Sequence, residues 1–321
     1  YILSKSCLKS SAKIRKRDIA TQFNVALMKE AYLYDKLDEG KVKCHVCARE
    51  CVIAEGKKGF CLTRENEGGK LYSIIYSWVS SEHVDPIEKK PLYHFYPGSL
   101  VYSLGTLGCN FRCEHCQNWS ISQVKPDRSL VFEITPEEAV EKAVVSGSKG
   151  IAWTYNEPAI WFEYTYDSAK LAKQAGLYTV YVTNGYITTQ ALEYIAPYLD
   201  AYRVDIKAFN ERFYQEVCSA KLQPVLDSSK KARELGMHVE VINLIIPEKN
   251  DSEQEIRGLS EWVYENLGDS TPMHFTRFTP MHKMTDSYPT PVKTLEKAVE
   301  IAKQTGLKYP YIGNVFGHKF E

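Results

Sequence analysis

The sequence lacks both a net charge and a long apolar run. Its 321 residues include 40 Lys plus Arg and 40 Asp plus Glu, so the formal charge at pH 7 is zero. A balanced charge gives no global attraction to nucleic acid or to an anionic membrane, and neither is expected as a partner. The one local exception is the basic run 13–17, interpreted as a solvated terminal stretch.

Targeting signals are also missing from the sequence. No stretch has the length and apolarity of a transmembrane helix, and none resembles a signal peptide. The chain begins at Tyr1 without Met, and we expect residues to be missing from both of its ends. A cytoplasmic location is the resulting prediction.

The cysteines do not suit a disulfide framework. There are nine, an odd number, and seven of them fall into two tight groups. Clustered cysteines in an enzyme-sized chain favour metal thiolates in a reducing compartment. Cys7 and Cys218 stand alone and are interpreted as ordinary residues.

From about residue 98 onward, strand and helix patterns alternate. Short apolar runs predict strands at 100–107, 150–155, 177–182, 201–206, 239–246 and 273–278, and 309–312 is a candidate for a last strand. Capping boxes at Thr135 and Ser252 predict the starts of two of the helices between them.

Six such βα units indicate a parallel sheet covered by helices. We therefore predict an α/β fold, a partial (β/α)6 barrel over 98–321. An open, doubly wound sheet is the competing architecture, since periodicity alone does not separate the two. In both, ligands bind at the carboxyl ends of the strands.

Residues 1–97 have a different pattern and are predicted to form a small N-terminal module packed on the barrel. A helix is expected over 22–37, and 70–79 alternates as a strand or hairpin does. Between these two segments lies one of the cysteine groups.

The other group, Cys109, Cys113 and Cys116, directly follows the first predicted barrel strand. A C-x3-C-x2-C loop can turn three thiolates toward one point. An iron–sulfur cubane held by three thiolates keeps one iron without a protein ligand, open to a small amino-acid ligand. The alternative is a structural zinc ion with a fourth ligand such as His115.

This loop resembles that of the radical S-adenosylmethionine (SAM) enzymes, and in particular of pyruvate formate-lyase activating enzyme and its relatives. The whole chain, with its cysteine-rich N-terminal module, is most similar to the radical SAM member of the AmmeMemoRadiSam system. The resemblance implies a [4Fe–4S] cluster, SAM bound at its open iron, and reductive cleavage of SAM to methionine and a 5′-deoxyadenosyl radical. It also implies a low-potential electron donor, such as a ferredoxin or flavodoxin.

The resemblance further implies that SAM is held by residues at the strand ends. His115 stands where the family usually has an aromatic residue beside the adenine, and Glu157 where it holds the SAM amino group. Asn184 is a candidate for contact with the ribose or carboxylate. Asp205 and Lys207 match an Asp-x-Lys that would orient and neutralise that carboxylate. The structural alternatives are a surface carboxylate for Glu157, an Asn-Gly turn at Asn184, and a plain ion pair for the other two.

The N-terminal group, Cys44, Cys47, Cys51 and Cys61, supplies four thiolates within 18 residues. Four ligands saturate either a zinc ion or a second [4Fe–4S] cluster, and the sequence leaves both open. A closed site of this kind suits structure or electron transfer.

Three functions follow from these residues. The first is radical modification of a protein partner, of the kind that glycyl-radical activases perform. The second is radical modification of a small molecule or an RNA base, with the run 13–17 the one feature that favours RNA. The third is a non-enzymatic iron–sulfur electron carrier, which would have no need for the charged residues at the strand ends.

Overall fold

The structure is a computed structural model and describes residues 28–320. The basic run 13–17, Cys7 and the first part of the helix expected over 22–37 lie outside the described residues.

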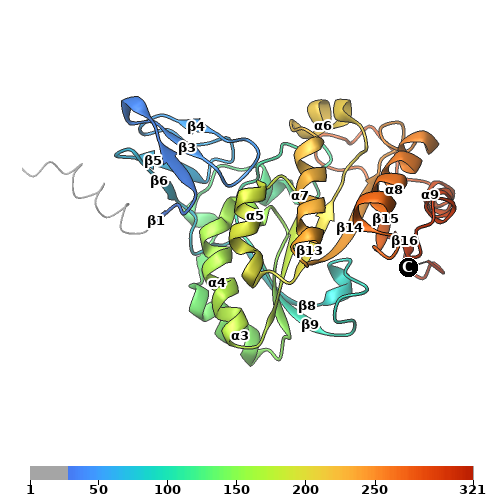
Figure 1. Cartoon of the computed structure of the whole chain (residues 1–321), viewed down its shortest axis with the longest axis horizontal. Helices are drawn as coiled ribbons and strands as arrows, with labels where there is room; N and C mark the ends of the chain where they lie inside the picture. The colour runs from blue at the N-terminus through green and yellow to red at the C-terminus, as the bar shows by residue number, and fades with distance from the viewer. Residues whose placement is uncertain (1–27, 321) are drawn as a thin grey trace, which may run out of the picture.

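An eight-stranded sheet forms the body of the molecule (Figure 1). Its strands, in chain order, are β8 (Ser81–Pro86), β9 (Leu100–Gly105), β11 (Gly150–Trp153), β12 (Tyr178–Thr183), β13 (Ala201–Asp205), β14 (His238–Ile245), β15 (Met273–Arg277) and β16 (Pro310–Gly313). β8 pairs antiparallel with β9, and all later neighbours pair in parallel. Each strand predicted after residue 98 is present, with its bounds shifted by at most two residues.

The order of the strands decides between the two predicted architectures. From β8 to β16 they follow one another across the sheet in chain order. A doubly wound sheet reverses its strand order at a switch point, and this sheet has no such reversal. The partial barrel is therefore confirmed, with one more parallel strand than six and an antiparallel strand at its edge.

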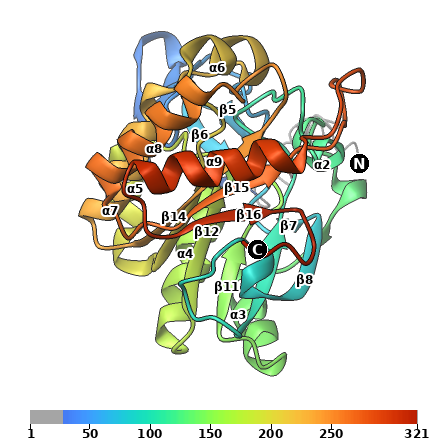
Figure 2. The same ribbon diagram turned by 90° about the vertical axis from the view of Figure 1, so that its right-hand side faces the viewer.

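Helices cover the outside of the sheet, as Figures 1 and 2 show. The helices of residues 28–320 are α2 (Trp119–Ser122), α3 (Pro136–Val145), α4 (Phe162–Gln174), α5 (Thr189–Ile195), α6 (Glu211–Cys218), α7 (Gln223–Glu234), α8 (Glu253–Leu267) and α9 (Val292–Gln304). Short 3-10 turns are η1 (Asp38–Gly40), η2 (Ile87–Lys89), η3 (Arg128–Leu130), η4 (Pro158–Trp161) and η5 (Ala196–Tyr198). Within residues 28–320 no helix combines the length and the hydropathy that crossing a bilayer requires.

The two predicted helix caps have different outcomes. Thr135 and Glu138 exchange both bonds of a capping box at the start of α3. At α8, Ser252 accepts the Glu255 N–H, but the Glu255 carboxylate accepts the backbone N–H of Phe209. This second box is half formed because a neighbouring loop supplies another backbone donor to the glutamate.

The segment between β8 and β9 fills the interior of the barrel at the starts of the strands. Leu92 and Phe95 pack there against Val101 and Ala201, which stand at the beginnings of β9 and β13. Glu240 of β14 anchors the segment by accepting two of its backbone N–H groups, at 2.9 and 3.1 Å, together with bonds from two histidines. With one end filled, the cavity of the barrel opens at the carboxyl ends of the strands.

The N-terminal module consists of short antiparallel strands. They are β1 (Lys29–Glu30), β2 (Tyr34–Lys36), β3 (Val42–Cys44), β4 (Val52–Ile53), β5 (Arg64–Glu67), β6 (Lys70–Ser73) and β7 (Trp78–Val79), with β10 (Phe132–Glu133) paired to β7. The predicted hairpin near 70–79 is β5–β6, which begins earlier, at Arg64.

The predicted helix over 22–37 is wrong for its described part, because β1 and β2 occupy that stretch. β1 pairs with β6, and the Ala31 N–H donates to the Leu71 carbonyl at 2.8 Å. Partners distant in sequence thus satisfy the backbone and override a local helical pattern. The proposed division at residue 98 also does not follow the sheet, since β8 precedes it.

A buried ion pair joins the module to the barrel. Arg64 of β5 donates two bonds, at 2.8 and 3.0 Å, to the two carboxylate oxygens of Glu163 in α4. The side chains are 3% and 0% exposed, so the pair is removed from water. Each of the two charges is tolerated in the interior only because the other is present, since an unpaired charge in this position would strongly destabilise the fold.

We expect Arg64→Ala to lower the free energy of unfolding by about 3–5 kcal/mol, since it leaves the Glu163 carboxylate buried and unpaired. Urea unfolding followed by circular dichroism measures the change. Lys173→Ala is the control: it removes a partly exposed pair with Asp200 and should cost at most about 1 kcal/mol. Equal effects of the two substitutions would contradict this account of the interface.

Candidate active site

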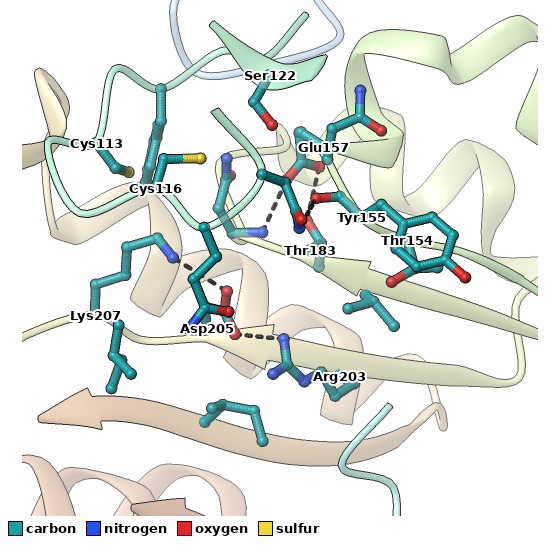
Figure 3. Close-up of a pocket in the computed structure, with 18 of the residues that line it drawn as sticks. Cys113, Cys116, Ser122, Thr154, Tyr155, Glu157, Thr183, Arg203, Asp205 and Lys207 are labelled. Carbon is teal, nitrogen blue, oxygen red and sulfur yellow. Dashed lines mark hydrogen bonds and ion pairs between the residues drawn. The ribbon is translucent and has the colours of Figure 1, made fainter. Parts of the chain in front are cut away.

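A cavity of about 350 Å³ lies at the carboxyl ends of the strands. Its wall includes all three cysteines of the C-x3-C-x2-C loop and all five other residues predicted for the site: Cys109, Cys113, Cys116, His115, Glu157, Asn184, Asp205 and Lys207. Figure 3 shows the side chains of this wall converging from the cysteine loop and from the ends of neighbouring strands. The structure therefore brings together every residue that the sequence singled out here.

The cysteine loop is fixed in place from several sides. Gly108, at its start, has φ of 91°, and a Cβ there would lie 2.8 Å from the side chain of Thr63, so the position requires glycine. Arg112 donates to the carbonyl oxygens of Cys109 and Phe60, at 2.7 and 2.6 Å. These bonds hold the loop against the N-terminal module.

The sulfur atoms lie in a buried environment that contains hydrogen-bond donors. The Phe111 N–H and the Asn184 amide approach Cys109 Sγ at 3.4 and 3.7 Å. Burial raises the pKa of Cys109 well above its ordinary value, and the charge of Glu157 raises it further. For Cys113 the first cause of a raised pKa is its hydrogen bond with Cys218, followed by burial. Thiolates here need a cation beside them, so binding of metal must release protons.

Glu157 ends the connection after β11 and is buried, with 1% of its surface exposed. One carboxylate oxygen accepts from the Ala159 N–H and the Thr183 hydroxyl, at 2.9 and 2.7 Å, and the other accepts from the Asn184 N–H at 2.8 Å. Two oxygens offer about four acceptor positions, so one remains for a donor in the cavity. Burial raises the pKa of Glu157 to about 7 against the lowering effect of these bonds.

Asn184 and His115 occupy the wall in different ways. The Asn184 amide donates to the side chain of Asn110 at 2.8 Å and accepts the Tyr186 N–H at 2.9 Å, so it braces the cysteine loop. His115 is 4% exposed, and its Nδ1 has no hydrogen-bond partner among the described residues. Burial, followed by the charge of Lys207, lowers the pKa of His115 to about 3.

Asp205 lies between two cations at the end of β13. Its carboxylate bonds Lys207 Nζ at 3.1 Å on one side and the Arg203 guanidinium on the other, as Figure 3 shows. Burial raises the pKa of Asp205, but the charges of Arg203 and then Lys207 outweigh it and lower the pKa overall. The predicted pair exists, but as a triad whose second cation the sequence reading missed.

Comparisons with known proteins identify relatives of this chain. A family model described as the radical SAM superfamily matches residues 104–260. An uncharacterized protein of Methanocaldococcus jannaschii is 50% identical over 294 residues, which cover 92% of this chain and 87% of the relative. The pyruvate formate-lyase-activating enzyme of Clostridium pasteurianum is 28% identical over 166 residues, covering 49% of this chain and 66% of that enzyme.

The chain belongs to the radical SAM superfamily. Membership and the activating-enzyme relatives identify an enzyme, which removes the electron-carrier alternative, and imply a [4Fe–4S] cluster and SAM. A radical SAM methyltransferase from Sphaerobacter thermophilus shares the fold over 93% of this chain and 82% of its own, with a TM-score of 0.55 and 12% identity.

The residues of this radical SAM chain fit the cluster that the family implies. Among residues 28–320 no group of Cys, His, Asp and Glu side chains is already gathered as a metal cage. The three thiols instead share one wall of an open cavity, with sulfur-directed donors beside Cys109. Soft thiolates, too few to saturate a cubane, next to free volume are the donor set that an open-iron cluster requires.

Two further residues of the wall were missed by sequence reasoning. Tyr155 has φ of 70°, in the left-handed region, and its hydroxyl bonds Asp85 at 3.1 Å. Lys90, from the segment between β8 and β9, is 4% exposed and bonds the same carboxylate at 2.7 Å. The backbone strain at Tyr155 and the burial of Lys90 both arise from tertiary packing, so no local sequence pattern predicts either of them.

The N-terminal cysteine group lines a second, small cavity of about 10 Å³. All four cysteines of the group line it, together with Ala159 and Ile160 of η4. Burial, and then the other cysteines of the group, raise the pKa of Cys47. The four-cysteine group therefore lies against η4 of the barrel.

The buried Glu157 predicts a pH dependence of stability in the metal-free protein. A carboxyl whose pKa rises from 4.5 to about 7 on folding favours the protonated folded state. Its contribution is thus present at low pH and is lost as pH rises from 4.5 to 7, by about 3 kcal/mol in total. The stability difference between wild type and Glu157→Gln should follow that curve, measured by urea unfolding at each pH. A difference that stays constant across this window would contradict the assignment.

Proposed function

We propose that this enzyme cleaves SAM reductively and that the resulting radical takes a hydrogen atom from a substrate held in the same cavity. The observation that carries the proposal is the single wall shared by Cys109, Cys113 and Cys116 and the charged strand ends. The cluster, once bound and reduced, supplies the electron that divides SAM into methionine and a 5′-deoxyadenosyl radical. A ferredoxin or flavodoxin is the proposed source of that electron.

The residues of the chain would hold SAM by its charged groups. The remaining acceptor position of Glu157 suits the SAM ammonium, and Lys207, whose pKa is raised mainly by Asp205 against the effect of burial, suits its carboxylate. His115, which lines the same cavity, would lie beside the adenine. Asn184 acts through the cysteine loop that it braces.

Part of this wall is buried. Glu157, Asn184 and His115 are buried, and the segment between β8 and β9 fills the other end of the barrel. Exclusion of water is necessary for a carbon radical, which would otherwise be quenched by side reactions.

Two substrate classes remain candidates, each with its own support. Relatives named as activating enzymes support a protein partner, which a glycyl-radical activase would modify. The buried cations Lys90 and Arg203 in the wall support a small molecule. The feature that favoured an RNA base, the run 13–17, lies outside the described residues.

Cys113→Ala should reduce 5′-deoxyadenosine formation to background, because two thiolates do not hold the cluster in its place. The assay incubates reconstituted enzyme anaerobically with SAM and a chemical reductant and quantifies 5′-deoxyadenosine by chromatography. Cys218→Ala is the matched control, a buried cysteine that bonds Cys113 but stands outside the loop, and it should retain most of the activity. Turnover by Cys113→Ala would reject the site.

We also propose that Cys44, Cys47, Cys51 and Cys61 hold a second metal centre, either zinc or a [4Fe–4S] cluster. Its support is the shared cavity and the mutual effect of the sulfurs on the pKa of Cys47. The same cavity includes η4, so the centre would also fix the module against the barrel.

Cys47→Ala should remove this second metal and leave the barrel cluster loaded, because the two cysteine groups line separate cavities. Metal and sulfide analysis of wild type and variant, together with the absorbance of the cluster, measures both centres. An unchanged metal content would show that the four cysteines bind none.

A further inference from the structure

Four cations gather at the wall of the cavity. Lys207 and Arg203 share Asp205, and Lys89 and Lys90 share Asp85. Glu240 is a further carboxylate whose charge acts on Arg203. Cations that gather in a cavity attract an anion that enters it.

Two of these cations, Lys90 and Arg203, are buried. They are 4% and 9% exposed, whereas the Lys89 side chain is 65% exposed and solvated. Both side chains line the cavity. Burial, which Asp85 opposes, lowers the pKa of Lys90, and the charges of Lys89 and then Arg203 lower it further. An anion between two such cations would relieve both the repulsion and the loss of hydration.

Arg203 also has an unused donor. Its guanidinium bonds Asp205, but among the described residues its Nε has no hydrogen-bond partner although it is buried. A buried N–H without an acceptor is costly, and the side chain to which this one belongs lines the cavity. Lys90 keeps donors too, because an ammonium has three and the structure uses one on Asp85 and directs the group toward the Tyr155 ring.

SAM does not account for these two cations. Its single carboxylate matches Lys207, and its ammonium and sulfonium are themselves positive. Lys90 and Arg203 would repel both of those groups, so their natural occupant is a second molecule that carries negative charge.

We propose that Lys90 and Arg203 form an anion-binding subsite for the substrate, which is a small molecule carrying a carboxylate or a phosphate. Both anions accept charge-assisted bonds from a guanidinium fork and an ammonium. The inference rests on the proposed function, since the substrate must lie in the cavity where the radical forms. It selects the small-molecule class over the protein partner.

The test titrates reconstituted, SAM-saturated enzyme anaerobically with inorganic phosphate and, separately, with acetate, at constant ionic strength, by calorimetry. Saturable binding of one anion is expected, and the anion that binds more tightly names the group. Lys90→Gln should weaken that binding at least about tenfold while leaving the affinity for SAM unchanged. Lys173→Gln, which removes a cation from an outer carboxylate pair, should bind as wild type does.

Three results would overturn the subsite: no uptake of either anion by the SAM-loaded wild type, uptake that SAM abolishes, or unchanged affinity in Lys90→Gln. The wild-type titrations decide the matter even if that variant does not fold. Arg203→Lys then provides a second test, because it retains the charge on Asp205 but loses the guanidinium fork and should weaken anion binding. Anion binding without 5′-deoxyadenosine formation would leave the subsite standing and reject the proposed function. The converse result would reject the subsite alone.

Discussion

The structure depends on burying charged and ionisable groups side by side at the carboxyl ends of parallel strands. Glu157, Asp205, Lys207 and Arg203 come from two separate strand ends and meet at one cavity. Isolated, each would be expensive to remove from water. Their bonds to one another, and the backbone N–H groups that donate to Glu157, offset the free-energy cost of burial. A few donor and acceptor positions remain without a partner among the described residues. A ligand that pairs with such positions gains the most binding free energy.

The sequence was sufficient for the barrel because its signals are local and repeated. Apolar runs separated by capped helices locate the strands, and their chain order in the sheet follows from short right-handed crossovers. Once the strands are located, the sequence alone assigns Glu157, Asn184 and Asp205 to their carboxyl ends, and no information about packing is needed. The cysteine loop needed only its spacing and its position after a strand.

What the sequence did not predict depends on contacts between distant segments. The stretch 28–37 has a helical pattern but forms strands, because β6 and β3 offer it partners. Lys90 enters the cavity because Glu240 and the barrel interior hold the segment between β8 and β9 in place. Arg203 could have been predicted from the sequence, because alternation along β13 puts it on the same face as Asp205. A single arginine in a strand, however, does not form a recognisable motif.

The two cysteine groups are mechanically connected although they line separate cavities. Gly108 opens the barrel loop and lies so close to Thr63 and the Cys61 carbonyl that it has no room for a Cβ. Arg112 of the same loop bonds the Phe60 carbonyl, one residue before Cys61. A metal bound at Cys61, as proposed, would therefore also fix the surface on which the barrel loop rests. The proposed second centre would then contribute to the first by position, whether or not electrons pass between them, because a displaced Cys61 would move the loop that presents Cys109 and Cys113 to the cavity.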